Sequence, residues 1–162
     1  MGAKMNEVEV NVQTHPDQFK IHETIEDRKR QRAILKEFAQ RFNLTGKLTN
    51  TLSRLDATLY RDGEYFAIAE AKYRNNPIGK YSDYTIDVAK VDALIERARV
   101  EGVHAILVVS WEGDTRYLSL SKVAREWDGE DTLFTMKRQL RRDRSELADW
   151  VYCIPTSMFK VL

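Results

Sequence analysis

Three side chains that could act together in catalysis lie close to one another in the sequence: Asp56, Glu70 and Lys72. Hard divalent cations prefer carboxylate and carbonyl oxygens, so Asp56, Glu70 and the backbone carbonyl of Ala71 would suit Mg²⁺. Side chains two positions apart on a strand share a face, which places Lys72 beside Glu70. A cation there would neutralise charge that develops on a phosphoryl group, and Lys72 would help to position or deprotonate the attacking water. The pattern therefore predicts metal-assisted attack of water on phosphorus.

The surroundings of Glu70 and Lys72 strengthen this prediction. The two residues follow the apolar run 65–69, which is typical of a buried strand. Burying a charge costs several kcal/mol, on the order of 3–5, unless the charge is paired or binds a metal. The alternative interpretation is structural: Lys72 forms an ion pair with Glu70 or Asp56 near the end of a strand.

A hairpin must bring the two acids together. The segments 54–61 and 64–73 read as strands joined at Asp62-Gly63. With a two-residue turn, Asp56 would lie opposite Ala69 and on the wrong face for Glu70. A three-residue turn with a left-handed Gly63 instead makes Asp56 and Glu70 diagonal neighbours on one face. We expect this bulged turn.

Other elements surround the hairpin. The apolar spacing predicts a helix over 24–43 that turns Gln31 inward. A second helix is predicted from about 84 to 100, with Lys90 at the rim of its apolar face and Gly102 placed to end it. Segment 74–82 reads as a loop, and 104–111 as a strand buried on both faces. Further strands are expected at 115–120 and 150–154, whereas the charged segment 121–148 has no clear assignment.

Several polar residues are candidates for binding a nucleic-acid backbone or base. Arg74 and Lys80 flank the loop beside the proposed site, and Tyr81 and Tyr84 could stack on bases, although buried tyrosines are commoner. A basic cluster that begins at Lys137 and includes Arg141, Arg142 and Arg144 could contact phosphates, although a solvated helix face is an equally good account of it. Lys90 could meet a phosphate or pair with Glu70.

The composition sets limits on the class of protein. The 162 residues suit one domain, and 26 basic against 25 acidic residues leave a nearly neutral chain, so charge decides nothing about a nucleic-acid partner. One cysteine excludes an internal disulfide framework and fits a reducing compartment. The absence of a long apolar run indicates a soluble protein with no membrane segment, and we expect a cytoplasmic location.

The motifs together resemble the PD-(D/E)XK nuclease superfamily, and most of all its small phage-encoded and prophage-encoded members. The matching stretches are residues 26–31, 54–56, 70–74, 84–86 with Lys90, 141–144, and 154–155 with Phe159. Two positions depart from the pattern. Gln31 stands where an additional Glu is expected, and it can accept a hydrogen bond but brings no charge for a second cation. Leu55 stands in place of Pro.

This resemblance implies a single restriction-endonuclease-like α/β domain over 1–162, with a mixed central sheet flanked by helices. Its αβββαβ core would span about 24–120, with a basic C-terminal extension over 121–162. It implies Mg²⁺-dependent cleavage of DNA, with Mn²⁺ as a substitute. The catalytic set would be Asp56, Glu70, Lys72, Gln31 and Lys90. The location would be the host cytoplasm, and a homodimer stays open because two sites are often needed to cut both strands.

Two rival functions remain. The same fold could be catalytically inactive and bind nucleic acid or a protein partner, with its acids serving the structure. A host-directed inhibitor without affinity for nucleic acid is the third hypothesis.

Overall fold

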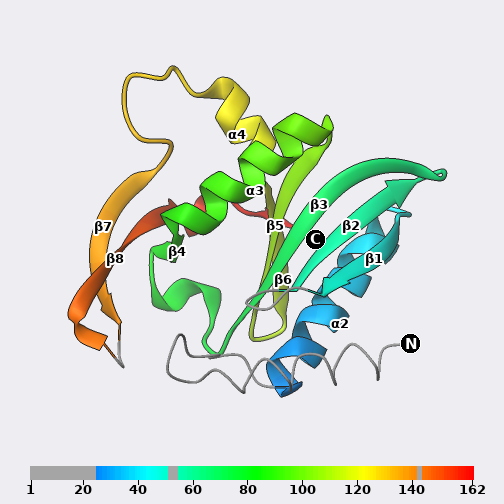
Figure 1. The fold of residues 1–162 in the computed structure, drawn as a ribbon. Coiled ribbons are helices and arrows are strands. Elements are labelled where there is room, and N and C mark those ends of the chain that lie inside the picture. Colours follow the sequence, from blue (N-terminus) through cyan, green and yellow to red (C-terminus); the bar gives the residue numbers. More distant parts are fainter. Residues whose placement is uncertain (1–24, 51–54, 142–143) are drawn as a thin grey trace.

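The computed structural model describes the backbone of residues 25–50, 55–141 and 144–162, and the side chains of all of these except 49–50, 55–56, 140–141 and 144–148. Two sheets and three α-helices make up the described chain (Figure 1). The larger sheet has the strand order β1-β2-β3-β5-β6-β9, and the smaller sheet has the order β4-β8-β7. This is the mixed α/β fold predicted from the sequence, with one more strand, β4, between the third core strand and the second core helix.

The larger sheet is mostly antiparallel. Its strands are β1 (Thr45–Asn50), β2 (Leu55–Arg61), β3 (Glu64–Arg74), β5 (His104–Trp111), β6 (Asp114–Ser119) and β9 (Lys160–Val161). Only β3 and β5 run parallel, and the connection between them carries β4 (Asp83–Asp87) and the helix α3 (Val88–Glu101). Both strands are largely buried, as expected for strands covered on both faces.

Each face of the larger sheet has its own apolar core. The helix α2 (Ile25–Arg41) covers one face, where Ile34 and Phe38 pack with Ala69 and Ala71 of β3. On the other face, α3 and the smaller sheet pack against Ile68 and the alternate residues of β5. Alternation along β3 thus places Glu70 and Lys72 on the α3 face.

The second predicted helix begins later than the sequence suggested. Residues 84–87 belong to β4, which pairs with β8 (Arg144–Pro155), and α3 starts only at Val88. Tyr84 and Ile86 are both buried, a period of two that places them on one face of a strand. The predicted end of the helix is confirmed: Gly102 adopts the left-handed conformation, and Val103 N–H donates to the carbonyl of Ala98 at 2.9 Å.

The hairpin register also differs from the prediction. The turn has two residues, because Arg61 pairs with Glu64 across Asp62 and Gly63, which both have positive φ. A bulge further along the ladder then leaves Phe66 as an extra residue on β3. It lies between the pair Tyr60–Tyr65 and the pair Leu59–Ala67. After this bulge, Asp56 pairs directly with Glu70. The predicted three-residue turn is therefore wrong, and the bulge that aligns the acids lies within β3.

The charged segment after β6 forms both helix and strand. Ser119 caps α4 (Leu120–Glu126), its hydroxyl accepting from the Lys122 N–H at 3.2 Å. The strand β7 (Thr135–Arg141) pairs with β8, which is longer than the predicted strand 150–154. Short 3₁₀ turns occur at Ile78–Lys80 and Thr156–Met158. The C-terminal residues contribute to both sheets, through β8 and β9.

Candidate active site

Glu70 is the charged centre of the site. It lies on β3, the strand between β2 and β5, and its side chain is 1% exposed. The Nζ of Lys90, on α3, lies 3.4 Å from Oε1 of Glu70, and the Lys90 side chain is 19% exposed. Of the two roles considered for Lys90, the structure thus has the ion pair with Glu70. A buried carboxylate is strongly disfavoured alone, and this ion pair offsets part of the cost of burying Glu70.

Asp56 occupies the position directly opposite Glu70 on the neighbouring strand β2. Directly paired positions of an antiparallel ladder lie on the same face, with Cβ atoms about 4.5–5.5 Å apart. Among the residues that the structure describes, this is the last pair of the ladder between β2 and β3, and Ala71 is the next residue of β3. Two acidic positions and a backbone carbonyl therefore meet at the end of the ladder, which is an oxygen donor set that suits Mg²⁺.

No group of three His, Cys, Asp or Glu side chains that could hold a metal ion occurs among the side chains that the structure describes. The side chain of Asp56 is outside that set. A site built from Asp56, Glu70 and the Ala71 carbonyl has two carboxylates, so it fits a cation that keeps several water ligands, as Mg²⁺ does.

Lys72 follows Glu70 on the same face, and both influence a buried tyrosine. Tyr84, on β4, is 2% exposed, and burial raises the pKa of its hydroxyl. The positive charges of Arg74 and Lys72 oppose this rise in the pKa of Tyr84, whereas the negative charge of Glu70 adds to it. Glu70, Lys72 and Arg74 of β3 therefore all act on the Tyr84 hydroxyl, which stays protonated at neutral pH.

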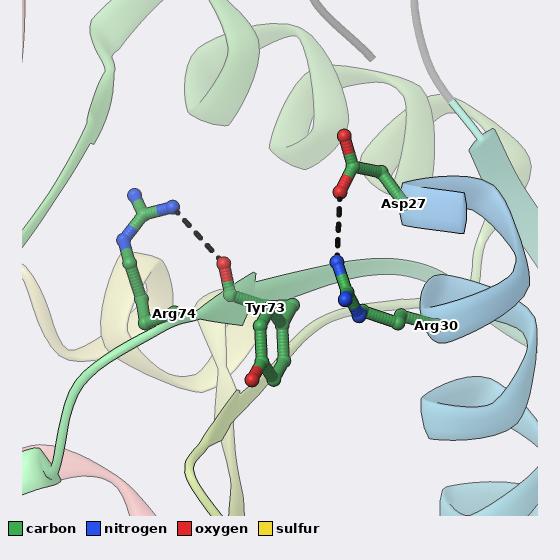
Figure 2. Close-up of polar contacts among 4 residues, drawn as sticks. All are labelled: Asp27, Arg30, Tyr73 and Arg74. Carbon is green, nitrogen blue, oxygen red and sulfur yellow. Dashed lines mark hydrogen bonds and ion pairs between the residues drawn. The ribbon is translucent and has the colours of Figure 1, made fainter. Parts of the chain in front are cut away.

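Arg74 is held in place at the end of β3. Its Nη2 donates to the carbonyl of Thr85 at 3.1 Å, and its guanidinium carbon lies 4.5 Å from the centre of the Tyr84 ring. Nη1 also reaches the carbonyl of Tyr73 at 3.5 Å (Figure 2). A guanidinium has five N–H donors, so several remain for a ligand.

The first turns of α2 lie against the same end of β3 from the other side. The guanidinium of Arg30 lies 4.9 Å from the centre of the Tyr73 ring and pairs with Asp27 at 3.2 Å (Figure 2). Gln31 is buried on the inner stripe of this helix. The helix covers the face of the sheet opposite to the one on which Glu70 lies.

The other predicted nucleic-acid contacts are placed as follows. Lys80 is exposed, with its Nζ 5.5 Å from the centre of the Tyr81 ring. The Tyr84 ring packs against Trp111 and Phe159, so the expected stacking of Tyr84 on a base does not fit its burial. Arg142 lies outside the described residues, as do the side chains of Arg141 and Arg144 at the end of the β7–β8 hairpin.

A pocket of about 430 Å³ beside the site contains residues that were not predicted from the sequence. Its walls come from the loop after β3, from β4, from the end of β5 and from β7. Asn76, Trp111 and Gln139 are among these unpredicted members. For Gln139, the signal available was its alternation with Lys137 along β7, which can be recognised only once this charged segment is known to be a strand.

The mixed sheet between helices, with an acidic pair and a lysine at the end of its central hairpin, defines a restriction-endonuclease-like fold. The family model described as "Phage putative PDDEXK endonuclease" matches residues 18–162, and the chain belongs to this family. This membership confirms the resemblance recognised from the motifs. No curated protein and no solved structure matches the chain significantly.

A nuclease family implies a nucleic-acid substrate, and PD-(D/E)XK nucleases generally use divalent metals. Among the helices of the described chain, none combines the length and the apolar character that crossing a membrane requires.

Proposed function

We propose that this protein is a Mg²⁺-dependent endodeoxyribonuclease that hydrolyses phosphodiester bonds of DNA at the Asp56–Glu70 pair, with Mn²⁺ able to replace Mg²⁺. The observation that carries the proposal is the register: Asp56 and Glu70 are directly paired at the end of the β2–β3 ladder, with Lys72 two residues further along β3. This is the arrangement that the chemistry of a phosphodiesterase requires.

Each residue has a stated role in the proposed reaction. Asp56, Glu70 and the carbonyl of Ala71 would hold the cation, which when bound would supply positive charge where negative charge develops on the phosphate. Lys72 positions the attacking water and stabilises its deprotonated form. Lys90 pairs with the Glu70 carboxylate and orients it, and Gln31 accepts a hydrogen bond from a water at the edge of the site.

The reaction can be tested with purified protein and DNA. Cleavage of plasmid and of linear DNA is measured with Mg²⁺, with Mn²⁺ and with EDTA. We expect cleavage only with a divalent ion, and we expect Asp56→Asn, Glu70→Gln and Lys72→Met each to reduce the rate at least about a hundredfold, as is typical when a group that stabilises transition-state charge is removed.

The matched controls are Glu64→Gln and Lys36→Met, which make the same chemical changes at exposed positions outside the site. Both should cleave at the wild-type rate. Wild-type rates in the Lys72→Met variant, with a folded protein by circular dichroism, would reject the proposed role of Lys72.

A second function is favoured by the ion pair between Lys90 and Glu70, which neutralises the buried carboxylate within the chain itself. In a catalytically inactive DNA-binding module, Glu70 would serve only this structural ion pair and would bind no cation. Such a module binds DNA in EDTA and does not cleave it, whichever divalent ion is added. Cleavage by wild-type protein that Glu70→Gln abolishes would exclude it.

A further inference from the structure

The pocket at the end of β3 is a distinct concave surface next to the candidate active site. Its volume of about 430 Å³ falls in the range of about 300–1,000 Å³ that is usual for sites that bind small molecules or parts of larger ones. Arg74 and Tyr84 belong to its wall, and Arg74 lies four residues beyond Glu70 on the same face of β3. At about 3.3 Å per strand residue, this places the pocket roughly 13 Å along the strand from the carboxylate.

The walls of the pocket combine two cations, amides and aromatic rings with one carboxylate, that of Asp83. Arg74 and Lys137 bring positive charge from β3 and β7, and Asn76 and Gln139 bring amide groups that can both donate and accept. Tyr81 also lines the pocket, yet it is 58% exposed. An exposed ring at the edge of a cationic pocket is the arrangement with which proteins bind single-stranded nucleic acids.

Tyr84 adds an independent observation. Its Oη is buried, and no hydrogen-bond partner for it occurs in the part of the chain that the structure describes. A buried hydroxyl without a partner is disfavoured, and such groups are retained where they serve a ligand or a reaction. This hydroxyl belongs to the same side chain that supports the Arg74 guanidinium, and it lies in the field of Lys72 and Glu70.

We propose that this pocket binds one nucleotide of an unpaired DNA strand adjacent to the scissile bond, so that Tyr81 stacks on its base while Arg74 and Lys137 contact phosphates. The proposal rests on the proposed function, because it assigns the substrate as DNA with a single-stranded segment next to the cut. A base held in a duplex cannot enter a pocket, whereas an unpaired base can leave the stack and be bound.

Binding is measured in EDTA, where no cleavage occurs, so the pocket is tested separately from the reaction. The probes are a short single-stranded DNA with one 2-aminopurine and a blunt duplex of the same sequence. We expect the single strand to bind at least about tenfold more tightly than the duplex, with quenching of the 2-aminopurine fluorescence as the base stacks on Tyr81.

Tyr81→Ala should weaken binding of the single strand about tenfold and remove the quenching. Its matched control is Tyr60→Ala, because Lys47 lies 5.4 Å from the centre of the Tyr60 ring just as Lys80 lies 5.5 Å from that of Tyr81. Tyr60 is not among the residues that line the pocket, so this control should bind as the wild type does.

Lys137→Ala should reduce the slope of log K against log salt by about 0.7, the contribution of one phosphate of a single strand. Arg138→Ala makes the same change in charge one residue along β7, on the other face of the strand, and should leave the slope unchanged. Circular dichroism verifies that the four variants are folded.

Equal affinity for single strand and duplex, or unchanged quenching in Tyr81→Ala, would overturn the pocket proposal even if the protein cleaves DNA. Conversely, single-strand binding that depends on Tyr81 and Lys137, in a protein that cleaves nothing, would support the pocket and reject the nuclease reaction. The two proposals therefore fail separately.

Discussion

Replacing Lys90 by Met tests how the fold tolerates the buried carboxylate of Glu70. The change leaves a methionine of similar length but removes the charge that lies 3.4 Å from Glu70 Oε1. At an effective dielectric constant of about 20, two unit charges at this distance attract each other by about 5 kcal/mol. Removing one partner of a buried pair typically costs about 3–5 kcal/mol, because the other charge stays buried. Since Lys72 shares the face with Glu70, we expect the lower end, about 3 kcal/mol.

The assay is equilibrium unfolding in urea, at neutral pH with EDTA present, supported by thermal melts. A loss of about 3 kcal/mol corresponds to a fall in Tm of roughly 6–12 °C for a chain of this size. The matched control is Lys29→Met. Lys29 lies 3.5 Å from Glu26, but these side chains are 63% and 69% exposed, so solvent screens their attraction and we expect a change of at most about 1 kcal/mol.

The double variant Lys90→Met/Glu70→Gln separates the pair from the packing of the methionine. Because the second change removes the uncompensated charge, it should restore most of the stability that the first change lost. The reasoning is refuted if Lys90→Met costs no more than Lys29→Met. It is equally refuted if the double variant is less stable than Lys90→Met alone.

Three further changes probe the fold and the site. Gly102→Ala, at φ +71°, should cost about 1 kcal/mol in urea unfolding, whereas Gly79→Ala, which has open space for a Cβ and no positive φ, should be neutral or slightly stabilising. Tyr84→Phe removes a buried hydroxyl with no partner among the described residues, so stability should hold or rise, and a loss beyond about 1 kcal/mol would contradict this. Burial and the hydrogen bond to Glu101 raise the pKa of Tyr65 from 10.0 to about 12. Between these two pH values the folded state binds more protons than the unfolded state, so the free energy of unfolding falls as the pH rises through this range. Tyr65→Phe should flatten that fall in pH-dependent unfolding.

The elements with strong apolar patterns were predictable from the sequence. The continuous run at 104–111 forms the buried strand β5, and the stripe with Ile34 and Phe38 forms the inner face of α2. Gly102 ends α3 as predicted, because only glycine adopts the left-handed conformation easily. In these places one local signal, periodicity or backbone freedom, decides the structure.

Two segments could not be predicted because their structure depends on distant partners. Residues 84–86 continue smoothly into the apolar pattern of a helix, and only pairing with β8 makes them a strand. Segment 135–141 is rich in charged residues, and its strand structure comes from the same partner. Tyr84, Thr85, Lys137 and Gln139 of the pocket lie on these two segments, so the sequence did not predict the pocket, although Lys137 belongs to the basic cluster that was predicted to contact phosphates.

The register of the hairpin at the candidate active site also depends on contacts that are distant in the sequence. Continuing the pairing of Arg61 with Glu64 without interruption would place Asp56 opposite Ala69, so that the two acids would lie on opposite faces of the sheet. Phe66, the extra residue of the bulge, shifts β3 by one position and brings Glu70 opposite Asp56. The bulge is stabilised by contacts that local sequence reasoning does not reveal. The centre of the Phe66 ring lies 4.9 Å from the centre of the His104 ring on β5, and the guanidinium carbon of Arg61 lies 4.1 Å from the centre of the Phe66 ring. A single residue with tertiary contacts therefore decides whether the two carboxylates can share one cation.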